Sequence, residues 1–540
     1  MNHTSKALAI GITLVAGAML SAQGAAPGLR LYNALGSTDT FLVDTNNTVV
    51  HTWAGTGGPG MVAYMDADGS VLRAQNAPGG PAVPGRGGQL LRIGFDGTIL
   101  WDYAIAGPNQ WAHIDIAPMP NGNVLLLVWD LMAAQDAIDA GRDPSLLAGS
   151  QWLPDAVIEV QQTGQTTGDV VWEWHFMDHV IQDFDSSKAN FGVVADHPEL
   201  LDINFPRNIL TDGEWNHCNA LDYDPVRDLV VVNSLFQEEF YLIDHSTTTA
   251  EAAGSTGGTY GRGGDILYRW GNPQAYGAGT ADDQKLFGMH GTSFIREGLV
   301  GAGNMLIFNN QAGRPFGMNY SSVVELRLPA SFSVQPGSAF GPSGFAWEYT
   351  DPFRPAFYSP AMANAQRLPN GNTLVCSAQQ AWLFEINASG QKVWEYFPVV
   401  PTPPAFVFRA EYHDRFLWAD TESASSSSSV TVDFDLVAGR RNAQNSYALL
   451  GSASGTAPGI AGRGFVLPLN PDAYLNFTAL AGLPGFSGTL DGLGNASASL
   501  TLPPLPPLMG MTLNHAFAVV DRRTMQVNLT SNPVPLVFTP

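Results

Sequence analysis

The sequence is poor in several features that define common protein classes. Only two cysteines, Cys218 and Cys376, occur among 540 residues, too few for a fold built on disulfides. Only 14% of the residues are charged, and 25 Lys and Arg stand against 48 Asp and Glu. Because nucleic-acid binding needs the opposite balance, no nucleic-acid partner is expected. Both cysteines lie in or beside apolar strand patterns and are predicted to be buried free thiols.

Long apolar stretches are also scarce. The run Ala7–Leu20 follows Lys6, and the small residues Ala22 and Gly24 come after it. This order is typical of a secretory signal peptide, predicted for residues 1–24. The run is shorter than the roughly 20 residues that span a bilayer, and no later stretch qualifies. The mature chain is therefore expected to be exported to the periplasm or the extracellular space, without a membrane span.

Glycine and proline, by contrast, are abundant, with 58 and 37 copies. They separate many short apolar runs, which predicts an all-β fold. One short strand with an aromatic end recurs, with the closest copies roughly 50 residues apart, a spacing typical of a four-stranded propeller blade. Its copies are Val49–Trp53, Ile99–Tyr103, Val170–Trp174, Ile266–Trp270, Phe345–Tyr349 and Lys392–Tyr396.

The strands between these markers predict a six-bladed propeller over residues 25–420. Asn121-Gly122 and Asn370-Gly371 are hairpin signals, since both turn positions tolerate positive φ. The unit that ends at Trp53 has only three strands, whereas one spare strand, Phe406–Tyr412, follows the last marker. Placing the spare strand innermost in the first unit closes the ring and removes the exposed sheet edges.

The first residues of the innermost strands should surround one mouth of the central channel. Equivalent positions, counted back from the turns, predict a ring of residues that contains three histidines and one arginine: Gly60-Met61, His113, His217, His290, Met362 and Arg409. Three histidines at equivalent positions favour a functional site over isolated structural histidines.

Clustered histidines and an arginine suit the transfer of an anionic group. Like charges disfavour protonation, so one imidazole can stay neutral and act as a nucleophile. Its neighbours and Arg409 can then stabilise negative charge on a sulfate or phosphate. A zinc or copper site formed by the three histidines is the main alternative. Arg409 would repel a cation and no acidic cluster joins the ring, so no metal or other cofactor is predicted.

The composition changes after Asp420. Residues 421–429 form a Ser-rich segment, predicted to be a linker. Alternating strand patterns with Gly and Pro turns then predict a small β-sandwich over residues 430–540. This region has few residues of catalytic type, so its expected role is structural or adhesive, with copies associating or assembling at a cell surface.

Several separate motifs in the predicted propeller resemble the arylsulfotransferases of bacterial periplasms. The resemblance extends from about Leu29 to Asp420. It is carried by Ala112-His113-Ile114-Asp115, Pro120-Asn121-Gly122-Asn123, Asn216-His217-Cys218-Asn219, Phe287-Gly288-Met289-His290, Gly303–Asn310 and Gln366–Leu374.

The resemblance implies a six-bladed propeller that moves a sulfuryl group from a phenolic sulfate ester to a phenol. It implies a sulfated histidine as the intermediate and no nucleotide sulfate donor. By motif, His290 would be the nucleophile. His113 and His217 would bind the sulfuryl oxygens and shuttle the proton.

Two positions depart from the family pattern. The family usually has Gln-His-Asp around the nucleophile, and this chain has Met289-His290-Gly291. The family also places an arginine after the second strand of the His217 unit, where this chain reads Asn233–Gln237. Arg409 or Arg314 could supply the missing charge. The alternative is a propeller with lost or altered catalysis that serves as an extracellular binding or assembly protein.

Overall fold

The structure of the protein is a computed structural model. It covers residues 24–540 except 27, 56, 58–60, 67–68, 96, 207–212, 400–404, 415, 440–441, 463–464 and 493. The predicted signal peptide lies almost wholly outside the described residues, as does Gly60 of the predicted ring. No helix in the described part is long and apolar enough to cross a membrane.

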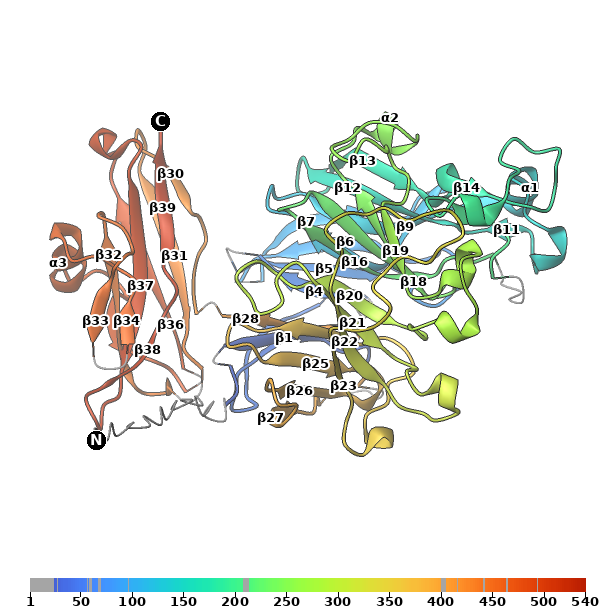
Figure 1. Cartoon of the computed structure of the whole chain (residues 1–540). Helices are drawn as coiled ribbons and strands as arrows, with labels where there is room; N and C mark the ends of the chain where they lie inside the picture. The colour runs from blue at the N-terminus through green and yellow to red at the C-terminus, as the bar shows by residue number, and fades with distance from the viewer. Residues whose placement is uncertain are drawn as a thin grey trace, which may run out of the picture.

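The chain forms six antiparallel sheets of four strands arranged as a propeller (Figure 1). From the innermost strand outward, the first three blades are β28 (Ala410–His413), β1 (Leu29–Asn33), β2 (Thr40–Val43), β3 (Val49–Trp53); β4 (Ala63–Met65), β5 (Val71–Asn76), β6 (Gly88–Ile93), β7 (Ile99–Ala104); and β8 (Gln110–Pro118), β9 (Val124–Asp130), β12 (Asp155–Gln162), β13 (Gly168–His175).

The other three blades are built in the same way, and the predicted aromatic marker is the outermost strand of every blade. They are β16 (Cys218–Asp224), β17 (Leu229–Ser234), β18 (Glu239–Asp244), β19 (Tyr268–Trp270); β20 (His290–Phe294), β21 (Met305–Asn309), β22 (Ser322–Leu326), β23 (Trp347–Tyr349); and β24 (Asn364–Arg367), β25 (Thr373–Ser377), β26 (Trp382–Ile386), β27 (Lys392–Tyr396).

The ring closes as predicted. Strand β28 pairs antiparallel with β1, with Leu29 opposite His413 and Arg30 opposite Tyr412. The spare strand is shorter than the predicted Phe406–Tyr412, although the Leu35 amide still donates a hydrogen bond to the Phe406 carbonyl. The all-β, six-bladed prediction is thereby confirmed.

The propeller core lies between the blades, because the side chains of each sheet pack against the next sheet. A separate buried cluster joins each neighbouring pair of blades all round the ring. Cys218 and Cys376 belong to two of these clusters as free, buried thiols. The loops between strands carry β10 (Met132–Ala133), α1 (Ala134–Asp139), β11 (Gln151–Trp152), β14 (Val180–Ile181), β15 (Leu201–Asp202) and α2 (Thr249–Ala252).

The C-terminal region contains two sheets that enclose a core of their own. Their strands are β29 (Leu417–Ala419), β31 (Val430–Val437) and β36 (Asn495–Leu502), and β30 (Ser423–Ser425), β39 (Val534–Thr539), β37 (Thr512–Val520), β32 (Ser446–Ser452) and β35 (Ser487–Thr489), with β38 (Val527–Thr530) beside β37. The hairpin β33 (Ile460–Gly462) and β34 (Phe465–Leu467) and the helix α3 (Ala473–Leu480) complete the region.

Two predicted boundaries need correction. Strand β29, which precedes residue 420, already belongs to a C-terminal sheet. The supposed linker 421–429 contains β30, which pairs parallel with β39 and buries Ala424. Serine-rich composition is typical of a linker, but backbone pairing with β39 holds this segment in the sheet.

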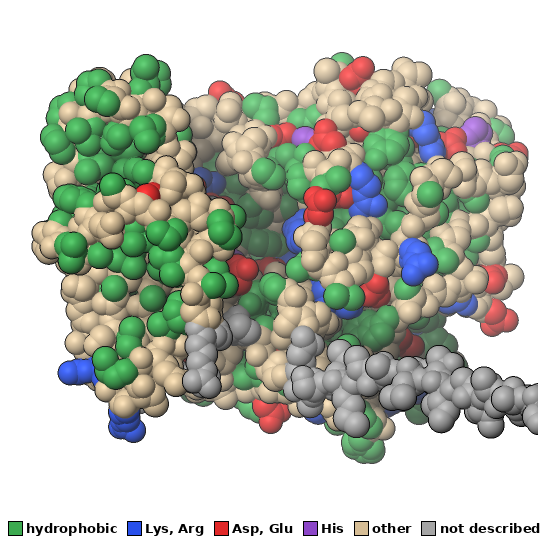
Figure 2. Space-filling model, turned by 60° about the vertical axis from the view of Figure 1, so that its left-hand side comes forward, with side chains coloured by type: hydrophobic (Ala, Val, Ile, Leu, Met, Phe, Trp, Pro, Cys, Tyr) green, Lys and Arg blue, Asp and Glu red, His purple; other side chains and the backbone are tan. Residues whose placement is uncertain are grey.

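The C-terminal region lies beside the propeller (Figures 1 and 2) and contacts turns that join strands of the first two blades. The ring of Trp418 stacks on Phe95 with 5.3 Å between centroids. Trp418 and Val437 share a buried cluster with residues of both blades. The Asn495 side chain also donates a hydrogen bond to the Val50 carbonyl.

Candidate active site

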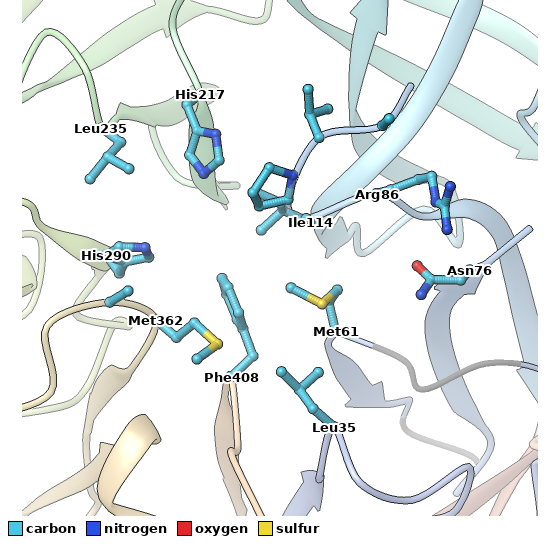
Figure 3. Close-up of a pocket in the computed structure, with 15 residues that line it drawn as sticks. Leu35, Met61, Asn76, Arg86, Ile114, His217, Leu235, His290, Met362 and Phe408 are labelled. Carbon is cyan, nitrogen blue, oxygen red and sulfur yellow. The ribbon is translucent and has the colours of Figure 1, made fainter. Parts of the chain in front are cut away.

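A pocket of about 580 Å³ lies where the innermost strands begin (Figure 3). Every blade contributes to its wall, and most of the lining side chains are apolar. In blade order, the contributing residues are Phe408, Met61, Ile114, His217, His290 and Met362.

Three of these residues have strained backbone conformations. Ile114 and His217 both have φ of +48°, and Met362 has φ of +62°. A non-glycine residue with a positive φ carries backbone strain on the order of 1–3 kcal/mol, and such residues are concentrated at functional sites. The shared kink turns equivalent side chains of three blades into the pocket.

His290 lies at one side of the pocket, and two polar contacts of its Nδ1 hold the ring in place. Its Nδ1 is 3.0 Å from the Gly288 carbonyl oxygen and 2.9 Å from Oδ1 of Asn310. Burial lowers the pKa of His290 to about 4, assisted by the charge of His217. The imidazole is therefore neutral at pH 7.

The contacts of Asn310 determine which nitrogen of His290 carries the proton. The Asn310 amide nitrogen donates to the carbonyls of Ser359 and Met362, both at 2.7 Å. This leaves Oδ1 of Asn310 as an acceptor facing His290, and the Gly288 carbonyl can only accept. Nδ1 of His290 is therefore the donor, and its Nε2 keeps a lone pair at the pocket.

His217 supplies positive charge next to this neutral imidazole. Its Nδ1 is 2.7 Å from Oε1 of Glu214, and both side chains are almost fully buried. Burial alone would lower the pKa of His217, but the hydrogen bond and charge of Glu214, with the charge of Asp155, raise it overall. The pocket thus combines a neutral histidine with one biased toward the charged form.

His113 does not line the pocket, so its predicted place there is wrong. Its side chain is fully buried, stacks on Trp129 at 4.1 Å, and has Nε2 2.7 Å from Oδ1 of Asp155. The neighbouring Ile114 takes the pocket position instead. Successive side chains of a strand point to opposite sides of the sheet. An error of one residue in counting back from the turn therefore puts His113 in the place of Ile114.

His113 still has an indirect connection to the pocket. The other carboxylate oxygen of Asp155 accepts a 3.3 Å hydrogen bond from the Cys218 amide, directly after His217. The Asp155 amide in turn donates to Asn216. His113 therefore lies behind His217, to which Asp155 connects it, and is not among the residues that line the pocket.

Arg409 is also absent from the histidine pocket, which corrects the predicted ring at a second blade. Phe408 lines that pocket, and Arg409 lines a separate cavity of about 230 Å³. Its guanidinium is buried and pairs with Asp115 at 2.9 Å and Glu411 at 3.1 Å. The same one-residue miscount accounts for the error.

Arg314 lies in a neighbouring groove of about 680 Å³ that shares Leu235 with the histidine pocket. Its guanidinium forms an ion pair with Glu238 and lies over the Phe287 ring at 4.8 Å. Neither predicted arginine therefore faces the histidines. The arginine that lines the pocket is Arg86, and its position in the loop between β5 and β6, outside the repeat, left no signal in the blade pattern.

No group of three or more His, Cys, Asp or Glu side chains in the described part of the chain is placed to hold a metal ion. With His113 turned away, the pocket itself is lined by two histidines, His217 and His290.

Comparison with known families gives one decisive match. Residues 64–415 match the model of the family described as Arylsulfotransferase (ASST), which is more than half of the chain. The chain belongs to the arylsulfotransferase family. Membership suggests arylsulfotransferase activity and implies phenolic substrates.

Other comparisons add little to this assignment. The search of curated proteins found no match. Similar solved structures include apo AztD from Citrobacter koseri (9% identity, TM-score 0.33, 72% of this chain and 99% of that one) and a protein from Lactobacillus plantarum (10%, 0.33, 95% and 97%). A third is a streptogramin B lyase (8%, 0.34, 72% and 90%). Likenesses this weak say nothing of this chain's substrate.

The structure shows the surroundings of the two positions at which this chain departs from the arylsulfotransferase family pattern. Gly291 has φ of +57°, and a Cβ there would lie 2.6 Å from the Ala363 carbonyl oxygen. Close packing between the fifth and sixth blades therefore excludes a side chain after His290. Leu235, in the segment where the family has an arginine, lines the pocket and makes its wall apolar.

Proposed function

We propose that the protein transfers a sulfuryl group from an aryl sulfate ester to a phenol through a covalent intermediate on His290. The observation that carries the proposal is the state of His290. Its Nδ1 is held by Gly288 and Asn310, its pKa is about 4, and its Nε2 has no partner among the described residues. An uncharged imidazole with an available lone pair is a competent nucleophile.

In the first half-reaction, Nε2 of His290 attacks the sulfur of the ester. The S–N bond forms as the bond from sulfur to the phenolic oxygen breaks. His217, with Glu214 on its Nδ1, is charged and donates its remaining N–H proton to the leaving phenolate. Its positive charge also stabilises the sulfuryl oxygens in the transition state.

In the second half-reaction, the acceptor phenol takes the place of the first product. Neutral His217 removes the phenolic proton while the phenolic oxygen attacks sulfur. The S–N bond breaks, which restores neutral His290 and charged His217. The apolar wall formed by Ile114, Leu235 and Phe408 suits an aromatic ring and excludes competing water.

The test is transfer from 4-nitrophenyl sulfate to phenol by wild type and by His290→Ala. We expect wild type to release nitrophenolate faster with phenol present and to form phenyl sulfate. His290→Ala should lose transfer, at least 1,000-fold, because no other described residue offers a neutral nucleophile at this place. The variant His197→Ala, which changes an exposed histidine, is the control and should keep activity.

Wild-type turnover by His290→Ala would refute the mechanism. A wild-type protein that transfers nothing from activated donors would favour the binding or assembly alternative. The N-terminal pattern also leads us to propose export, for which N-terminal sequencing of protein from the native host is the test. An unprocessed Met1 would contradict that proposal.

A further inference from the structure

The histidine pocket has two chemically different ends (Figure 3). His217 and His290 lie at one end, and Arg86 and Asn76 lie at the other. The labelled side chains between them are apolar. A ligand that fills the pocket would therefore contact imidazoles at one end and a guanidinium at the other.

Arg86 differs from the two predicted arginines in having no acidic partner among the described residues. Its Nη1 donates a 2.9 Å hydrogen bond to the Gly79 carbonyl, and no carboxylate among the described residues forms an ion pair with it. Arg409 and Arg314 are both paired with acids. A guanidinium with no acidic partner at the end of an apolar pocket favours an anionic ligand group, because its fork of donors fits such a group.

The backbone holds Arg86 in place. Arg86 forms an isolated antiparallel bridge with His113. The amide of Gly87 donates to the Ala112 carbonyl at 3.1 Å, and that of Ile114 donates to the Gly85 carbonyl at 2.9 Å. The segment is thus fixed to the innermost strand of the third blade, whose Ile114 lines the same pocket.

We propose that Arg86 binds a carboxylate on the aromatic substrate, so that the preferred substrates are phenolic acids and their sulfate esters. This rests on the proposed function for the assignment of the reacting end to His290 and His217. The phenolic oxygen lies at the histidine end, and the carboxylate extends from the far side of the ring toward Arg86. A guanidinium fork matches a planar carboxylate through two parallel hydrogen bonds.

The first test compares two acceptors that differ only in this charge: 4-hydroxyphenylacetate and its methyl ester, with 4-nitrophenyl sulfate as donor. We expect wild type to favour the acid in kcat/KM by roughly 10- to 100-fold, the scale of one charge-assisted pair. Arg86→Gln should reduce this ratio to about 1–3. The control Arg522→Gln removes an exposed arginine of the C-terminal region and should keep the wild-type ratio.

Two outcomes would overturn the proposal while leaving the proposed function intact. One is a wild-type enzyme that transfers to both acceptors without preference. The other is an Arg86→Gln variant that loses transfer to the acid and the ester equally, which would mean that Arg86 binds the sulfuryl group instead.

Binding without donor separates this proposal from the transfer mechanism. Titration calorimetry should show tighter binding of 4-hydroxyphenylacetate than of its methyl ester to wild type, and no difference with Arg86→Gln. If no acceptor is sulfated but this binding preference exists, the proposed function fails and the carboxylate site stands. Equal binding of the two compounds by wild type would refute the site.

Discussion

Glu214 offers the sharpest test of how the two pocket histidines divide their roles. Its carboxylate accepts from Nδ1 of His217 at 2.7 Å in an almost fully buried setting. The substitution Glu214→Gln keeps the shape of the side chain and removes its charge. Burial then acts on His217 without the main opposing group, so the pKa of His217 should fall.

The expected loss of activity follows from this one contact. A hydrogen bond to a charged group contributes about 1.5–3 kcal/mol, and each 1.36 kcal/mol changes a rate tenfold. At pH 7 Glu214→Gln should therefore lower kcat/KM for 4-nitrophenyl sulfate by roughly 10- to 100-fold.

The pH profile supplies a second, more specific readout. Activity requires neutral His290 and charged His217, so the wild-type profile should rise through a pKa of about 4 and fall above the ordinary histidine pKa. Losing the charge of Glu214 moves the alkaline limb to lower pH. Burial is the main cause of the low pKa of His290, so the acid limb should stay near its wild-type position and the bell narrows from the alkaline side.

A matched pair elsewhere provides the control. His197 and Glu199 form a contact of 2.9 Å at a more exposed place, outside the pocket lining. Glu199→Gln should leave both limbs and the rate at their wild-type values. If Glu214→Gln does not shift the alkaline limb, His217 is not the proton donor and the division of roles is wrong.

Two further substitutions test the groups behind the pocket histidines. Asn310→Ala should lower kcat for transfer by about 10-fold with little change in the donor KM, because Nδ1 of His290 loses the shorter of its two acceptor contacts and keeps only the Gly288 carbonyl. Steady-state kinetics measure both constants, and a pure KM effect would contradict this expectation. His113→Ala should cost about 2–4 kcal/mol in the free energy of unfolding, through the lost stack on Trp129 and the contact with Asp155, measured by urea denaturation. Its transfer rate should stay within about tenfold of wild type; a stable but inactive variant would show that His113 contacts substrate.

The overall propeller could be predicted from the sequence because its signals are local and repeated. The aromatic outer strand recurs in all six units, and an Asn-Gly turn, Asn121-Gly122 or Asn370-Gly371, occurs in two of them. The pairing of β28 with β1 followed from counting strands, since a closed ring needs no edge. These features depend on composition and short spacing, which the sequence displays directly.

The site was only partly predictable because the sequence does not show which of two neighbouring strand residues faces the pocket. Ile114 has a positive φ, and the pairing of β8 with β9 is irregular between Ala112 and Ile116. Without this information, counting back from the turns gave the neighbouring residues, His113 and Arg409. At His217 and His290 the same count gave the residues that line the pocket. Arg86 was missed because tertiary contacts alone bring its loop to the pocket.

The late position of β28 has a consequence for how the chain folds. Strand β1 cannot complete its sheet until residues 410–413 are available, so the first blade depends on contacts of very long sequence separation. Folds dominated by such contacts form slowly. A nascent or truncated chain that ends before Ala410 would leave β1 as an open edge that can pair with other chains and aggregate. The C-terminal sheets begin at Leu417, directly after ring closure, but β30 pairs with β39 at the end of the chain, so these sheets can be completed only after the ring has closed.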